Sequence, residues 1–170
     1  MIISAGRLLL RPFEDKDAQA LYLIHREENV ARYLPNESYA DAGEALSAIR
    51  FFAACVEKGR LPFVLAVTLN EQLIGDAGIN EVEGSPDEVE IGFCISQDFS
   101  SQGYATEAAL ALEHFAVHAF NLKKLQGRVM QGNAASCRVL EKCGYRYLFT
   151  DPHAPDDPWG KGMLVYEKTL

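Results

Sequence analysis

The sequence predicts an α/β fold of the α+β type, in which a mostly antiparallel sheet contains one parallel pair of strands. Residues 61–95 predict three neighbouring antiparallel strands, because the links between them are short and rich in turn residues. Residues 89–95 alternate apolar and polar side chains with the period of two that a strand requires. A long helix at about 103–120 then leads to a strand at 124–130, and such a crossover helix joins parallel strands.

The elements before this region follow from local patterns. Residues 7–13 predict a short strand, which Pro12 ends. Three helices are expected next, with apolar residues at helical spacing, over residues 18–25, 29–34 and 42–58. The hairpin strands are expected at residues 61–69 and 72–82, with a turn at 84–87 leading to a strand at 88–95.

The C-terminal part predicts one helix and two strands. Asn133 is a good N-cap and Gly144 a good C-terminal cap for a short helix between them. Strands at 145–149 and 163–168 are expected to complete the sheet. The polar, proline-rich residues 151–161 predict an exposed loop, with the rim of an acceptor site as the alternative.

Composition bounds the class of protein. A length of 170 residues suits one domain, residues 1–170. The net charge of −8 argues against a nucleic-acid or anionic-membrane binder, and it suits either a cationic substrate or a surface kept acidic for solubility. No signal peptide or membrane-spanning run is recognised, and four cysteines without paired spacing suit reduced thiols, so a cytoplasmic protein is expected. His114 and His118 have a metal-ligand spacing but lack a third ligand nearby, so no metal site is expected.

The joint between the strand at 89–95 and the helix after it has the pattern of an anion site. Unpaired N–H groups at a helix start, together with the helix dipole, attract phosphate. The backbone of residues 102–105 is therefore a candidate cradle, and Gly103 lets a phosphate approach closely. Many such joints bind nothing, so this pattern alone leaves the alternative of a purely structural turn open.

The residues at this joint also resemble a known motif. Ser100-x-x-Gly103-x-Ala105, preceded by Glu-Ile-Gly-Phe and followed by Thr-Glu-Ala, resembles the acetyl-CoA motif of the GCN5-related N-acetyltransferase (GNAT) superfamily. Ser100 stands where the family usually has Gln or Arg. The resemblance implies a twisted sheet of six to seven strands flanked by about four helices, with the parallel strands splayed apart at the cofactor site and Gly92 easing a bulge there.

A second motif supports the same family. Residues 133–145, Asn-x-x-Ser-x-x-Val-Leu-Glu-Lys-x-Gly-Tyr, resemble its second cofactor motif. Many relatives place a proton-donating Tyr at the position of Leu140, and Ser136 is the replacement that the branch of ribosomal-protein N-terminal (RimJ/RimL-type) acetyltransferases suggests. Together, the resemblance implies that acetyl-CoA contacts these residues: Phe93, Ile95, Ser100, Ser101, Gln102, Gly103, Tyr104, Ala105, Thr106, Asn133 and Ser136.

The resemblance implies transfer of an acetyl group from acetyl-CoA to a primary amine, of a protein N-terminus or a small molecule, by direct attack in a ternary complex. Glu90 is the candidate base, with a structural ion-pair partner of Lys or Arg as the alternative role, and Ser136 is the candidate acid. Arg32 and Tyr33 are candidate substrate contacts. The alternative function is a non-catalytic acyl-CoA-binding sensor. Family members are often dimers, so a homodimer is left open.

Overall fold

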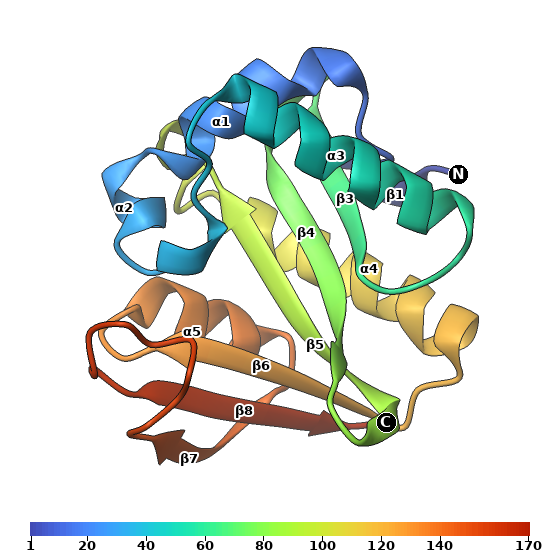
Figure 1. Ribbon diagram of the computed structural model, residues 1–170. Helices are drawn as coiled ribbons and strands as arrows, with labels where there is room; N and C mark the ends of the chain where they lie inside the picture. Colours follow the sequence, from blue (N-terminus) through green and yellow to red (C-terminus); the bar gives the residue numbers. More distant parts are fainter.

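The computed structural model describes residues 1–170 and contains an eight-stranded sheet in the order β1-β2-β3-β4-β5-β6-β8-β7 (Figure 1). The strands are β1 (Ile3–Ala5), β2 (Leu8–Arg11), β3 (Phe63–Leu69), β4 (Gln72–Val82), β5 (Ser85–Ile95), β6 (Lys124–Met130), β7 (Arg146–Asp151) and β8 (Met163–Thr169). The α-helices are α1 (Ala18–His25), α2 (Glu28–Ala31), α3 (Ala42–Glu57), α4 (Tyr104–Phe120) and α5 (Ala134–Lys142). The α/β fold with one parallel pair is confirmed, with eight strands and five α-helices in place of six to seven strands and about four helices.

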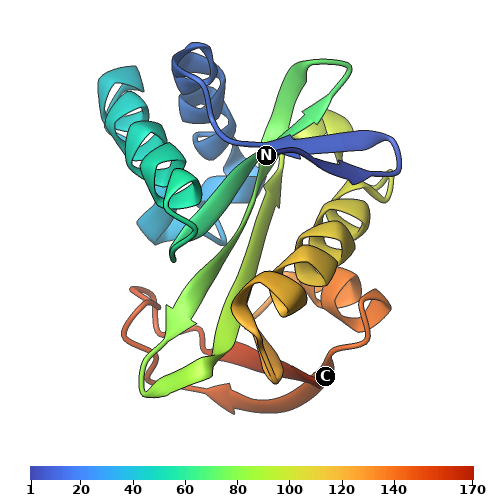
Figure 2. The ribbon, with the colours of Figure 1, turned by 90° about the vertical axis from the view of Figure 1, so that its right-hand side faces the viewer.

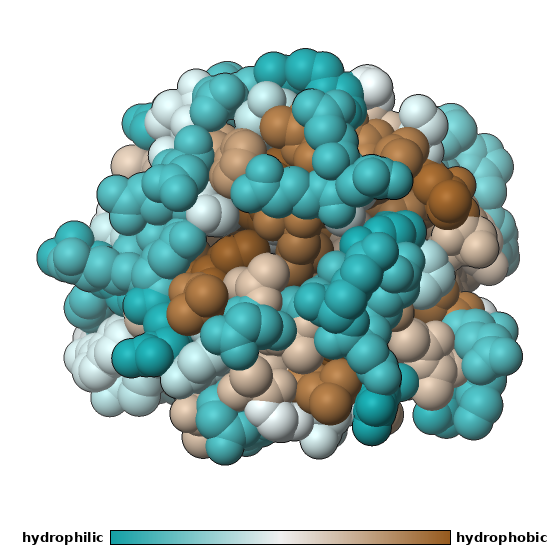
Figure 3. Space-filling view, turned by 90° about the horizontal axis from the view of Figure 1, so that it is seen from above, coloured by the Kyte–Doolittle hydropathy of each residue, from teal (hydrophilic) through white to brown (hydrophobic).

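Helices cover both faces of the sheet. Figure 2 shows α1 and α3 on one side of the central strands and α4 and α5 on the other. The larger apolar cluster joins α4 to the sheet through residues such as Leu112 and Ile79, and a smaller one joins α1 and α3 through residues such as Leu21 and Ile49. Seen from above, the outer surface is mainly hydrophilic with scattered apolar patches, an ordinary distribution for a protein surface (Figure 3).

The central hairpin follows the predicted pattern. Asn70 and Glu71 have φ values of 48° and 69°, which suit a two-residue turn whose twist matches that of the flanking strands. The predicted turn at 84–87 is wrong beyond Gly84, because β5 already begins at Ser85 and Ser85 pairs with Val82. The hairpin therefore turns at Glu83 and Gly84, and β4 and β5 make a long antiparallel pair.

The parallel strands β5 and β6 separate along their length. Their pairing runs from Glu88 with Lys124 to Ile91 with Gly127. Beyond Ile91, β5 continues beside β4 alone, whereas β6 continues beside β8, so the two strands diverge in a V (Figure 1). The splayed pair implied by the resemblance is thus present. The expected bulge at Gly92 is wrong, because Gly92 pairs in regular register with Gly78 and the register of β4 and β5 shifts only at Glu81 and Val82.

Two terminal features differ from the sequence-based expectation. The strand β1 was not expected, and it pairs antiparallel with β2. The strand β7 extends to Asp151, two residues further than predicted, so the proline-rich loop begins later. No helix is both long and apolar enough to cross a membrane.

Candidate functional site

The start of α4 leaves a row of backbone donors free. No backbone N–H group from Ser101 to Thr106 donates a hydrogen bond within the chain, and the N-cap Gly103 has a φ of 86° that favours glycine. The N–H groups of residues 101–106 lie at the positive end of a 17-residue helix. This arrangement fits the phosphates of a nucleotide-like cofactor.

Arg7, which the sequence analysis did not single out, supports this loop from the opposite end of the chain. Its Nη2 donates to the Gln102 carbonyl at 2.7 Å and lies 2.7 Å from Glu107 Oε1. Its Cζ lies 4.2 Å from the centroid of the Tyr104 ring. Arg7 therefore holds the turn before α4 in place. The Ser100 hydroxyl is already engaged within the chain, because it donates to the Gln97 carbonyl at 2.8 Å.

Phe93 and Ile95 lie on β5 beyond the point where β6 leaves it. Both are half-buried, and each pairs only with β4, at Ala77 and Gly75 respectively. The edge of β5 that faces the splay is thus unpaired over these residues. Such an edge offers hydrogen-bonding groups to an extended chain.

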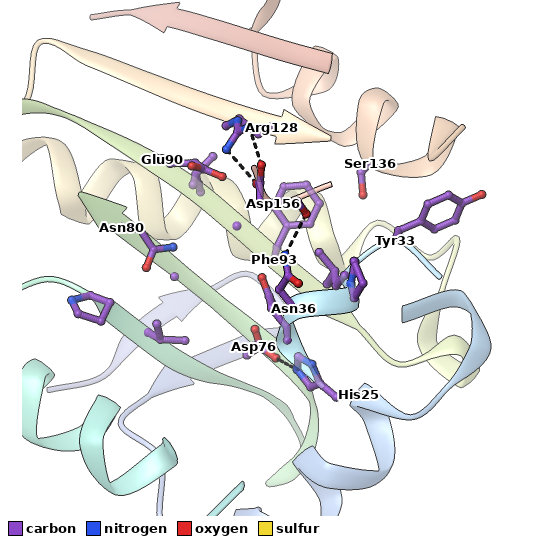
Figure 4. A pocket seen from close by; sticks show the side chains of 18 of the residues that line it. His25, Tyr33, Asn36, Asp76, Asn80, Glu90, Phe93, Arg128, Ser136 and Asp156 are labelled. Atoms are coloured by element: carbon purple, nitrogen blue, oxygen red, sulfur yellow. Dashed lines mark hydrogen bonds and ion pairs between the residues drawn. The ribbon is translucent and has the colours of Figure 1, made fainter. Parts of the chain in front are cut away.

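A groove of about 420 Å³ lies on the α1 and α3 side of the sheet, next to the splay. Its floor comes from β4, β5 and β6, and its walls include residues 33–39 and Asp156 of the proline-rich loop (Figure 4). Glu90, Tyr33, Asn133 and Ser136 all line it. Arg32 does not, because it lines a separate shallow depression with Trp159 and Lys161.

Glu90 is a carboxylate without a bonded partner. It is half-buried and makes no hydrogen bond or ion pair, and burial raises its pKa. Arg128, whose charge opposes that rise, is bonded instead to Asp156, by two hydrogen bonds of 2.9 and 2.8 Å (Figure 4). Glu90 is therefore not the ion-pair partner that the alternative role required, and its geometry suits proton transfer.

Ser136 is oriented by Asn133 at the start of α5. Asn133 Nδ2 donates to Ser136 Oγ at 3.0 Å, while Asn133 Oδ1 accepts from the Ser136 N–H at 3.3 Å. Because Oγ accepts from Asn133, its own proton is free to be donated into the groove. Leu140 lies one turn further on and is buried against Gly127, so it serves packing. Tyr33 donates to the Gly132 carbonyl at 3.2 Å, which links the end of α2 to this segment.

A buried polar cluster lies at the other end of the groove and was not predicted. His25 Nε2 and Asp76 Oδ2 are 2.8 Å apart, and Glu37 lines the groove beside them. His25, Asp76 and Cys94 place one ligand atom each within 4.8 Å of one another. These residues come from α1, β4 and β5, so no spacing in the sequence marks them.

Comparisons with known proteins give a match to a family model and to a named relative. A family model described as an acetyltransferase (GNAT) domain matches residues 7–146. The uncharacterized N-acetyltransferase YnaD of Bacillus subtilis (strain 168) is 30% identical over 146 residues, covering 86% of this chain and 83% of that protein.

Two solved structures share the fold at 16% identity. The ribosomal L7/L12 α-N-protein acetyltransferase RimL in complex with coenzyme A has a TM-score of 0.83, covering 100% of this chain and 98% of that one. The microcin C7 self-immunity acetyltransferase MccE in complex with acetyl-CoA and AMP has a TM-score of 0.80, covering 97% and 93%.

Proposed function

The chain belongs to the GNAT acetyltransferases, which makes it an enzyme that uses acetyl-CoA, and we propose that it acetylates a primary amine by direct attack in a ternary complex. The observation that carries the proposal is Glu90. It is an unpaired, half-buried carboxylate that faces the groove beside the splayed strands. A base in this place can take the proton that an ammonium acceptor must lose before it attacks.

Acetyl-CoA supplies a thioester whose carbonyl carbon is already electrophilic. The backbone N–H groups of residues 101–106 would hold its phosphates, and the unpaired edge of β5 at Phe93 and Ile95 would hold its pantetheine arm. These N–H groups have no acceptor within the chain, and Gly103 carries no side chain beside them, so the site fits the group. Such contacts would bring the thioester to the groove, where positioning of the two reactants contributes to the rate.

Proton transfers then complete the reaction. Glu90, directly or through one water, takes a proton from the ammonium, and the neutral nitrogen attacks the thioester carbon. The carbon–sulfur bond breaks, and the Ser136 hydroxyl donates its proton to the departing thiolate. The attacking nitrogen loses its second proton to solvent, Glu90 releases the proton that it took, and Ser136 regains one. The net products are the acetylated amine, free coenzyme A and one proton.

The test is Glu90→Gln, which keeps the shape and removes the base. We expect kcat to fall by about 10²–10⁴-fold, the range for general base catalysis, while the dissociation constant of acetyl-CoA changes little. The matched control is Glu83→Gln in the exposed turn after β4. An unchanged kcat in Glu90→Gln would remove this residue from the mechanism.

The pH profile gives an independent check on the same base. Because burial raises the pKa of Glu90 above its ordinary value, the base is protonated, and activity is lost, as pH falls through that raised pKa. The acid limb of kcat therefore lies above the ordinary range of a glutamate, and Glu90→Gln removes it. A limb that persists in this variant would assign the titration to another group.

The finer assignments are also proposals. RimL, with which this chain shares its fold, is an α-N-protein acetyltransferase, and a protein N-terminus is accordingly one acceptor to test. Four free cysteines suit a cytoplasmic location, and we treat residues 1–170 as one domain because β1 and β8 join the same sheet. The sensor alternative predicts acetyl-CoA binding without amine-dependent thiol release.

A further inference from the structure

Gly92 lies in the floor of the groove, although the backbone there does not require glycine. Its φ is not positive, and a Cβ built on it would meet no atom within 4 Å. By contrast, its cross-strand partner Gly78 is confined, because a Cβ there would lie 2.8 Å from Val64 Cγ2. Glycine weakens a strand interior, and it often marks a place where a ligand approaches the backbone closely.

On this face of the sheet, polar side chains lie on either side of Gly92 and Gly78, which leave the groove floor without a side chain. Glu90 and Asn80 face each other at one end, since side chains two residues apart along a strand share a face. Asp76 occupies the other end, opposite Cys94. The four residue steps from Glu90 to Cys94 span roughly 13 Å along the strand. The groove is thus an elongated slot with a carboxylate at each end (Figure 4).

At the Asp76 end of the groove, two carboxylates, those of Asp76 and Glu37, lie beside a single cationic group, the imidazole of His25. His25 is the one cationic partner of Asp76, at 2.8 Å, and the carboxylate of Glu37 makes no hydrogen bond or ion pair. Although Glu37 is exposed at the rim of the groove, the surrounding protein and the charge of Asp76 together raise its pKa to about 7. His25 is only 3% exposed, and its Nδ1 is buried without a partner. A cation bound here would stabilise two carboxylates that now repel each other.

We propose that the acceptor is an extended amine with two cationic groups, of the α,ω-diamine class. This inference rests on the proposed function. Its reacting nitrogen lies on the Glu90 side of the slot, and its chain crosses the bare backbone at Gly92. Its second ammonium group binds between Asp76 and Glu37. The apolar walls, such as Phe52 and Leu34, suit the methylene chain between the two charges.

The experiment compares a series of α,ω-diamines, from putrescine to octamethylenediamine, with n-alkylamines of equal length as acceptors. Thiol release gives kcat/KM for each amine. We expect diamines of the best length to exceed their monoamine counterparts by roughly 10- to 100-fold, the range for a hydrogen bond to a charged group. Glu37→Gln should bring the ratio of the diamine value to the monoamine value of equal length down toward one.

Glu37 lies in a surface 3-10 turn, so this variant is expected to fold normally, and acetyl-CoA binding checks that it does. Gly92→Val should lower kcat/KM for every amine while acetyl-CoA still binds. Equal use of diamines and monoamines by the unaltered enzyme would overturn this inference and leave the proposed function standing. Acetyl-CoA binding without thiol release from any amine would overturn both.

Discussion

Replacing Gly127 by alanine places a methyl group against Leu140 on α5. A Cβ at Gly127 would lie 2.7 Å from Leu140 Cδ1 and 2.8 Å from Cδ2, and Leu140 is only 1% exposed. Contacts this short force either the leucine or the backbone of β6 to move. Overpacking of this kind costs about 1–3 kcal/mol, and removing glycine from a strand returns about 0.5–1 kcal/mol. Taking the middle of each range, the free energy of unfolding should fall by about 1–2 kcal/mol.

The assay is urea denaturation followed by far-ultraviolet circular dichroism, with the melting temperature as a second readout. For a chain of this length, about 1–2 kcal/mol corresponds to a drop in Tm of roughly 2–8 °C. The control is Gly92→Ala in the neighbouring strand, where a Cβ meets no atom within 4 Å. That variant should be as stable as the parent or slightly more stable.

A double-mutant cycle isolates the contact. Leu140→Ala alone should cost about 2–5 kcal/mol, because it leaves a cavity under α5. In the Gly127→Ala background it should cost less, by about 0.5–3 kcal/mol, since the new methyl group partly fills that space. If Gly127→Ala leaves stability unchanged, or if the two costs simply add, the close packing between β6 and α5 is refuted.

Three further predictions concern the site. Arg7→Ala frees the Gln102 carbonyl, so the dissociation constant of acetyl-CoA, measured by calorimetry, should rise a few-fold while kcat at saturation stays the same. An unchanged affinity would contradict the role of Arg7 in holding the turn before α4. Asp156→Asn should free Arg128 to pair with Glu90, which lowers kcat and moves the acid limb of the pH profile of kcat to lower pH. An acid limb at the same pH as in the parent enzyme would count against this arrangement. Ser136→Ala should lower kcat by at least about tenfold, and a smaller loss would restrict this serine to hydrogen bonding.

The sequence predicted the parts of the fold that repeat with a regular period. The long helix α4, the hairpin at Asn70-Glu71 and the crossover to β6 all follow from spacing and turn chemistry. The three-residue strand β1 shows no such period, since its partner β2 alone determines it. The bulge expected at Gly92 was wrong for an instructive reason, because that glycine leaves open space and does not bend the strand.

The residues of the site also divide into those that the sequence could place and those that it could not. Residues within one continuous motif, such as Asn133 and Ser136, were brought together as the sequence suggested. The pairing of Arg128 with Asp156, and of His25 with Asp76, depends on elements far apart in the chain. Periodicity carries no information about contacts of that kind, so the charge pattern of the groove emerged only from the structure.

The central claim is that the chain binds acetyl-CoA and passes the acetyl group to an amine. The most direct measurement is isothermal titration with acetyl-CoA, followed by thiol release against a panel of amines and peptides. Our account predicts saturable one-to-one binding and thiol release that depends on the acceptor. Binding without release would support the sensor alternative. Absence of binding would contradict the cradle at the start of α4, and the proposed function would fail with it.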